Sequence, residues 1–205
     1  MVLSTAYFPP IEYFALMAKC SIVYLEACEN YQKQSYRNRF CFYADNGRQA
    51  LNFPVVHENG TFSLPITKIK VDYSTPWVVR TERAITSAYS SSAFFEYYKD
   101  ELFAILDSHP ETLWDLNLQL IQFFVRKIGL AVEIRQTESF SVPGTIEDDY
   151  REIIHPKRAN TIMEDLGAAR PYYQVFADKH GFIPGLSVMD LLFNEGPESI
   201  CYLKR

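Results

Sequence analysis

The stretch that decides the fold class is VLSTAYFPPIEYFALMAKCSIVYL, residues 2–25 at the start of the chain. Its first six residues favour a short strand, which Pro9-Pro10 would end. Proline suits the first turn of a helix, and Ile11–Lys19 then carries the apolar residues of one. Ser21–Leu25 has the composition of a buried strand. A strand, a helix and a strand in this order are typical of two parallel strands joined by a helix, so an α/β fold is predicted.

A β-hairpin is predicted directly after this unit. The β-like runs Arg39–Tyr43 and Ala50–Val55 flank a turn that contains Asn46-Gly47. This pair is the strongest short hairpin signal, because both residues of the usual two-residue turn need positive φ. Lys68–Asp72 is expected to add a further strand.

The middle of the chain is expected to be helical. One helix should begin at Thr75-Pro76, and a second should span Ala93–Leu106, with Ser92 as its cap. A capping box at Ser108–Glu111 predicts the start of a third helix, which runs to Ile128 before Gly129. Ala131–Gln136 should then form a strand.

The C-terminal part is less regular in sequence. Asp148–Ile154 is expected to form a short helix, and Ser187–Asn194 another, whereas residues 170–180 fit either a helix or a strand. Without repeats or a linker, we expect one domain over residues 1–205. Its fold class is α/β (α+β): a mixed sheet with an N-terminal strand–helix–strand, a β-hairpin, and a helical middle and C-terminal region.

Composition excludes several classes of protein. Apolar residues make up 48% of the chain and charged residues 22%, as in folded globular proteins. The formal charge is −5, from 20 basic and 25 acidic residues, which disfavours nucleic-acid binding. Because neither a secretory signal nor a membrane-spanning apolar run is present, we expect no membrane span and a cytoplasmic location.

Most templates for catalysis and cofactor binding are missing. The four cysteines form no Cys-x-x-C pair and no zinc spacing with histidine. No glycine-rich phosphate loop or dinucleotide fingerprint is present among only eight glycines. We therefore expect no metal and no cofactor, and we interpret the four histidines as residues of the surface or of helix ends.

The exception is the block EACENYQKQSYRNR, Glu26–Arg39, which places charged, amide and phenol groups between a buried strand and the hairpin. Loops held by rigid elements are where binding groups usually lie. Lys33 and Glu29 are the catalytic candidates, since a desolvated lysine and a carboxylate can act as nucleophile or base. The binding candidates in the block are Tyr31, Arg37, Asn38 and Arg39. The alternative is a solvated polar loop with internal salt bridges.

The chain also resembles the WbqC-like proteins, a bacterial family often encoded among surface-polysaccharide genes. The residues that carry this resemblance are Tyr7-Phe8-Pro9, Lys33-x4-Asn38-Arg39, Phe53-Pro54-Val55, Trp77, Ile85-x3-Tyr89, Phe94-Phe95, Asp115-Leu116-Asn117, and the closing stretch from Leu186 to Gly196. Many members have a His-Gln-Pro element where this chain has Leu3-Ser4-Thr5, and a histidine where it has Arg80-Thr81-Glu82. These departures and the double Pro9-Pro10 indicate a distinct, Bacteroidetes-type subgroup.

The resemblance implies work on activated sugars, such as transfer of an acyl or aminoacyl group to an amino sugar. The two phosphates of a nucleotide-sugar would suit Lys33, Arg37 and Arg39. The rings of Tyr7, Tyr31 and Trp77 could stack on a sugar or base, and Arg80 joins these substrate-binding candidates.

Two functions stay open. A transferase predicts a concave pocket where Tyr7, Lys33, Arg39 and Trp77 converge on an anionic small molecule. The alternative is a non-catalytic binding or assembly protein of the same pathway, with a homodimer patch on Phe94, Phe95, Tyr97 and Tyr98. Because aromatic residues at helical spacing are more often core, those four are interpreted first as packing residues.

Overall fold

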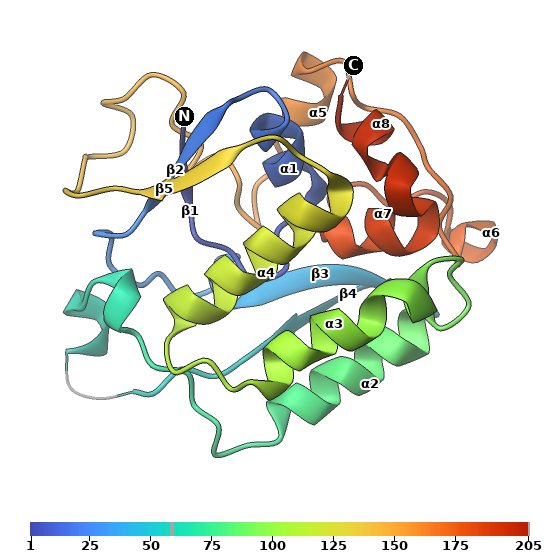
Figure 1. Ribbon diagram of the computed structural model, residues 1–205, viewed down its shortest axis with the longest axis horizontal. Coiled ribbons are helices and arrows are strands. Elements are labelled where there is room, and N and C mark those ends of the chain that lie inside the picture. The colour runs from blue at the N-terminus through green and yellow to red at the C-terminus, as the bar shows by residue number, and fades with distance from the viewer. Residues whose placement is uncertain (58–59, 205) are drawn as a thin grey trace.

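The structure is a computed structural model that describes residues 1–57 and 60–204. Its N-terminal unit is the predicted one: β1 (Val2–Ser4), α1 (Ile11–Met17) and β2 (Ile22–Glu26) follow one another, and β1 pairs with β2 in parallel. β5 (Glu133–Gln136) pairs in parallel with the other edge of β2. The result is a three-stranded parallel sheet in the order β1-β2-β5 (Figure 1). The predicted α/β class is confirmed.

The predicted hairpin is also confirmed, as a separate two-stranded sheet. β3 (Arg39–Ala44) pairs antiparallel with β4 (Gly47–Asn52). Gly47 has φ 96°, whereas Asn46 keeps a negative φ, so the turn is not the mirror-image type that Asn-Gly predicts. The strand predicted at Lys68–Asp72 is wrong, because Lys70 and Val71 form only isolated bridges, to Thr112 and Val55.

Three long helices follow, as predicted: α2 (Trp77–Tyr89), α3 (Phe95–Asp107) and α4 (Leu113–Ile128). Two predicted caps are wrong. The side chain of Ser92 caps nothing, and the cap of α4 is Thr112, whose hydroxyl accepts a hydrogen bond from the Asp115 backbone N–H. His109, at φ 51°, turns the chain away from a helical path before α4 begins.

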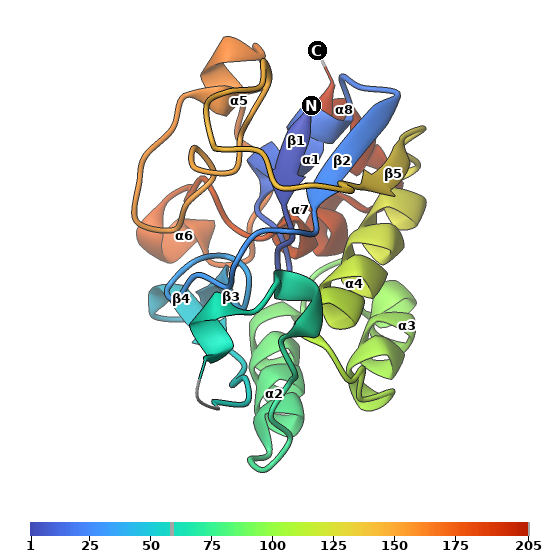
Figure 2. The same ribbon diagram turned by 90° about the vertical axis from the view of Figure 1, so that its left-hand side faces the viewer.

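The C-terminal part holds short helices. These are α5 (Ile162–Asp165), α6 (Ala177–His180), α7 (Val188–Glu195) and α8 (Ser199–Leu203), with a 3-10 turn at Gly196–Glu198. Two further 3-10 turns, Thr61–Ser63 and Ile66–Lys68, lie between β4 and α2. α7 begins after the predicted cap Ser187. The helix predicted at Asp148–Ile154 is wrong: the segment forms turns, and its first residues bond to the backbone of Val2 at the edge of β1. Figure 2 shows α5 and α6 along one side of the molecule, above the hairpin.

The two sheets and the long helices share one hydrophobic core. Within this core, Phe124 of α4 contacts the rings of Phe8 and Phe14. The ring of Tyr7 contacts those of Phe40, Phe53 and Trp77. The proposed dimer patch is wrong for two of its four members, since Phe95 and Tyr98 are buried, whereas Tyr97 is 77% exposed. Within the described ranges, no helix is long and apolar enough to cross a bilayer.

One acidic side chain lies inside this core. Asp190 of α7 is 1% exposed, and its Oδ2 accepts hydrogen bonds from the Tyr172 hydroxyl at 2.5 Å and from the Gln174 amide at 3.0 Å. Burial raises the pKa of Asp190 from 3.8 to about 6, although these donors favour the charged form. The folded state therefore holds this proton more tightly than the unfolded state does.

Asp190 should make stability fall as pH rises. Its contribution is fully present below pH 3.8, the unfolded pKa, and is lost as pH rises through about 6. Relative to wild type, Asp190→Asn should therefore gain about 2 kcal/mol of unfolding free energy between pH 4 and pH 7. Denaturant unfolding at both pH values measures this difference, with Asp178→Asn as an exposed control. An equal wild-type-to-variant difference at both pH values would contradict the raised pKa.

Candidate functional site

The predicted block begins at the carboxyl edge of the parallel sheet. The strands β1, β2 and β5 run in the same direction, so Ser4, Glu26 and Thr137 meet at this edge. In open α/β sheets, ligands usually bind outside the carboxyl ends of the strands. The edge is therefore the first place to look for a site.

Two buried arginines neutralise the acids at this edge. The Arg37 guanidinium donates from Nε to Glu29 Oε1 at 2.9 Å and from a terminal nitrogen to Glu29 Oε2 at 2.5 Å. The same terminal nitrogen of Arg37 also donates to the Ser4 hydroxyl, at 2.8 Å. Both oxygens of Glu29 are thus held by one forked cation, the strongest geometry for such a pair.

The second arginine, Arg151, comes from a distant segment. It donates to both carboxylate oxygens of Asp149, at 2.9 and 2.7 Å, and to Glu26 Oε2 at 2.7 Å. The other oxygen of Glu26 accepts from the Thr137 hydroxyl at 2.6 Å and from the Cys28 backbone N–H. We call these residues, with Ser4, Glu29 and Arg37, the edge network.

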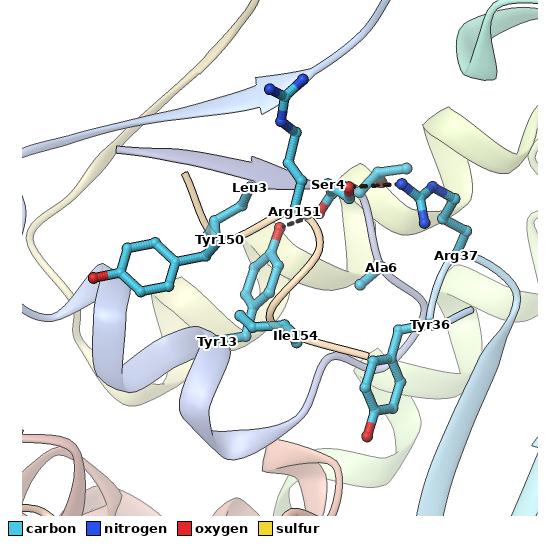
Figure 3. A pocket seen from close by; sticks show the side chains of 10 residues that line it. Leu3, Ser4, Ala6, Tyr13, Tyr36, Arg37, Tyr150, Arg151 and Ile154 are labelled. Carbon is cyan, nitrogen blue, oxygen red and sulfur yellow. Dashed lines mark hydrogen bonds between the residues drawn. The ribbon is translucent and has the colours of Figure 1, made fainter. Parts of the chain in front are cut away.

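The edge network leaves almost no room for a ligand. Figure 3 shows the cavity beside it, in which Tyr13 donates to the Ser4 carbonyl while the Arg37 and Arg151 guanidinium groups point in different directions. The cavity encloses about 10 Å³, roughly the space of one water molecule. The internal salt bridges of the alternative interpretation are therefore present, and they engage Glu29 and Arg37.

The remaining candidates do not meet in one place. Lys33 and Arg80 are exposed, Arg39 is half-buried at the start of β3, and the Asn38 amide donates to the Phe53 carbonyl at 2.8 Å. The three aromatic candidates, Tyr7, Tyr31 and Trp77, are buried. The rings of Tyr7 and Trp77 contact each other in the core. Burial also raises the pKa of Tyr7. None of Tyr7, Lys33, Arg39 and Trp77 lines the cavities described here, so the convergence expected of them is not seen.

A larger cavity lies on the other side of the block. It encloses about 430 Å³ between α1, the hairpin, the segment before α5 and the Pro184-Gly185 turn. We call it the basic groove; its polar lining residues are Glu12, Tyr36, Arg48, His155, Lys157, Arg158, Asn160 and Glu164. A volume in this range is typical of small-molecule sites.

Glu12 lies at the inner wall of the basic groove. It occupies the first turn of α1, which Pro10 begins, and its residue is only 6% exposed. Its Oε1 receives a single long hydrogen bond, 3.4 Å from the Asn160 amide, and its Oε2 is buried without a hydrogen-bond partner among the described residues. Burial raises the pKa of Glu12, while the nearby Arg48 opposes this shift and Glu164 adds to it. A buried carboxyl with a free oxygen is a group suited to proton transfer.

Cations surround the outer part of the groove. Arg48 reaches the Gly185 carbonyl at 3.3 Å, and Arg158 lies 3.4 Å from the Glu152 carboxylate. Lys157 donates to the Gln34 side chain, which ties the groove to the predicted block. These long or neutral contacts leave positive charge that an anion can use, in a chain whose net charge is −5.

His155 adds a donor of a different kind. Its Nδ1 accepts the Lys157 backbone N–H at 3.2 Å, so in the neutral ring the proton is on Nε2. Burial, helped by the neighbouring Arg158, lowers the pKa of His155 and favours this neutral form. The ring can therefore donate a hydrogen bond at neutral pH.

A second cavity of about 260 Å³ adjoins the groove. The two share Glu12, Met163, Glu164, Pro184 and Gly185, so the Glu12 carboxyl lies at their boundary. Most other residues of the second cavity are apolar, and we call it the apolar pocket. Within the described part of the chain, no group of three His, Cys, Asp or Glu side chains gathers as metal ligands would.

The sequence analysis did not identify Glu12 or His155. Glu12 gave no signal in the sequence, because a carboxylate is common in the first turn of a helix and only the fold buries it. His155 gave no signal either, because its place in the same cavity lining as Glu12 arises only in the fold.

The edge network should be structural. Glu29→Gln leaves the buried Arg37 charge without its partner and should lower the free energy of unfolding by about 3–5 kcal/mol. Lys33→Ala, at an exposed position of the same loop, should change it by less than about 0.5 kcal/mol. Urea unfolding measures both variants. The double variant Glu29→Leu, Arg37→Met should recover part of the loss, and a stable Glu29→Gln would contradict this role.

Comparison with known proteins supports one assignment. The chain is 25% identical to a protein of Mycobacterium tuberculosis, described as uncharacterized protein Rv1507c, over 99% of this chain and 96% of that protein. No solved structure gives a significant match. The family model described as the WbqC-like protein family matches residues 5–176, which include the edge network except Ser4 and most of the basic groove. The chain therefore belongs to the WbqC-like protein family.

Proposed function

We propose that the basic groove binds a nucleotide-linked amino sugar and that Glu12 moves the proton when an acyl or aminoacyl group is transferred to its amine. The observation that carries this proposal is the buried Glu12 carboxyl, with one oxygen unpartnered, beside a cavity lined by cations. Catalysis would then centre on Glu12, in place of the predicted Glu29 and Lys33.

The charge of the groove supports a phosphorylated substrate. Arg48, Lys157 and Arg158 outnumber the one exposed acid in the lining, Glu164, and arginine forks match phosphate oxygens. The neutral His155 adds an Nε2 donor to the same wall. The diphosphate of a nucleotide-sugar fits this set better than an uncharged sugar does.

The transfer step needs one proton carrier. The sugar amine attacks the carbonyl carbon of an acyl thioester, a C–N bond forms, and the C–S bond breaks. The Glu12 carboxylate accepts the proton that leaves the nitrogen and passes it to the departing sulfur, so that an amide and a thiol are the products. A carboxyl whose pKa burial has raised toward neutrality can do both.

The family supports the setting of this reaction. The WbqC-like proteins that this chain resembles are often encoded among surface-polysaccharide genes, and activated sugars are made in the cytoplasm. A cytoplasmic location and the Bacteroidetes-type subgroup accordingly remain part of the proposal. The alternative, a binding protein without catalysis, uses the same groove.

Charge removal tests where the anion binds. Lys157→Ala and Arg158→Ala should each weaken binding of UDP-glucosamine about tenfold, the value of one hydrogen bond to a charged group. Lys33→Ala and Arg80→Ala are the matched controls, exposed cations outside the groove. Isothermal titration calorimetry measures all four. A loss confined to Lys33→Ala and Arg80→Ala would place the site at the residues first predicted and overturn the groove.

Glu12→Gln tests the chemistry. It should keep UDP-glucosamine binding within about threefold and lower the rate of amide formation by about 10²–10⁴, because the amide side chain cannot carry the proton. In wild type the rate should rise with pH through the raised pKa of Glu12, as the carboxylate forms, and this rise should vanish in the variant. Wild-type binding without any amide product from acyl thioesters would favour the non-catalytic alternative.

A further inference from the structure

The apolar pocket has no role in binding the sugar or its phosphates. Its walls come from α1, α5 and the segment after it, residues 182–185, α7 and α8, and they include Ile11, Met163, Ala168, Tyr172, Phe182 and Leu191. Ile11, Ala168 and Leu191 are buried, whereas Phe182 is 36% exposed. Its ring packs edge-on against Tyr172, with ring centroids 5.3 Å apart. The pocket thus has apolar walls that remain open to solvent.

The size of the pocket limits its occupant. A cavity of about 150 Å³ takes a benzene ring, so one of 260 Å³ takes roughly ten carbon atoms. An acetyl or glycyl group would leave most of it unfilled. A long fatty chain of sixteen or more carbons, on the same scale of roughly 25 Å³ per carbon, would extend beyond the pocket into solvent.

The position of the pocket limits the occupant further. Its boundary with the basic groove is the Glu12 carboxyl, and Gly185 lies there too, where a Cβ would be 3.5 Å from Glu12 Oε1. A molecule that fills both cavities must therefore be anionic at one end and apolar at the other, with its reacting atoms beside Glu12. The N-acylated nucleotide-sugar has this form, with its diphosphate in the groove and its acyl chain in the pocket.

We propose that the apolar pocket holds the hydrocarbon chain of the transferred group, which is an unsubstituted acyl group of up to about ten carbons. This inference rests on the proposed function, since the chain is placed relative to Glu12 and to an anion in the basic groove. It names the donor class that the groove alone leaves open.

Alkyl phosphates test the pocket without any reaction. Binding of methyl, butyl, octyl and dodecyl phosphate should tighten by up to about fourfold per methylene as far as octyl and then level off. 8-Aminooctyl phosphate, which ends in an ammonium group, should bind more weakly than octyl phosphate, because most of the walls are apolar and the acids of the lining, Glu12 and Glu164, lie at the boundary with the groove. Calorimetry of the full chain measures each dissociation constant.

A variant places the chain in the pocket. Ala169→Phe adds a ring at an exposed position of the lining and should remove most of the gain from methyl to octyl phosphate, with methyl phosphate itself unaffected. Ala93→Phe, at an exposed position between α2 and α3, is the matched control and should change neither.

The outcomes separate the two proposals. If methyl phosphate binds and chain length has no effect, or if Ala169→Phe keeps the full gain, the acyl pocket is overturned while the groove stands. If neither inorganic phosphate nor methyl phosphate binds at all, the proposed function fails and this inference fails with it.

Discussion

The edge network of buried arginines and carboxylates is the interaction on which the other parts depend. Arg37 and Arg151 satisfy Glu29, Asp149 and Glu26 at the carboxyl edge of the sheet. Taking such ions out of water costs several kcal/mol each, so the arrangement is stable only when every acid has its partner. That requirement draws residues 26–39 and 148–151 to the same edge, although they are far apart in the chain.

The network positions the candidate site indirectly. With Arg37 held inside, the Arg37 carbonyl accepts from the buried Asn117 amide of α4, and the adjacent Tyr36 faces the basic groove. On the other side, Arg151 fixes the start of the segment that carries His155, Lys157 and Arg158. The edge network therefore positions both walls of the basic groove, the one with Tyr36 and the one with His155. Charged residues outside the groove thus determine its shape.

Two carboxylates in this molecule show how burial divides structural from chemical roles. Glu29 is buried with two donors from one guanidinium, and its charge is fully used. Glu12 is buried with one long contact and an unpartnered oxygen, and its pKa is raised. A fully paired acid stabilises the fold, whereas an under-paired acid at a cavity wall is available for a proton. The contrast explains why the densest cluster of charges is not where the proposed chemistry occurs.

Local patterns determined the elements and the fold class. The strand–helix–strand of residues 2–25, the hairpin around Gly47 and the long helices follow from apolar spacing, proline and turn residues, all of which act over a few positions. Local patterns failed where a distant partner decided the outcome. Residues 148–154 bond to Val2 and Glu26 instead of forming a helix. The N-cap of α4 is Thr112, with which Lys70 forms an isolated bridge.

Local sequence patterns could not predict the candidate site for the same reason. The sequence by itself showed that Glu26–Arg39 is rich in charge, but exposure and pairing arise only when segments more than one hundred residues apart meet. Arg151 reaches Glu26 and Asn160 reaches Glu12 across such separations, and it is these contacts that turn one acid into a structural ion pair and leave the other facing a cavity.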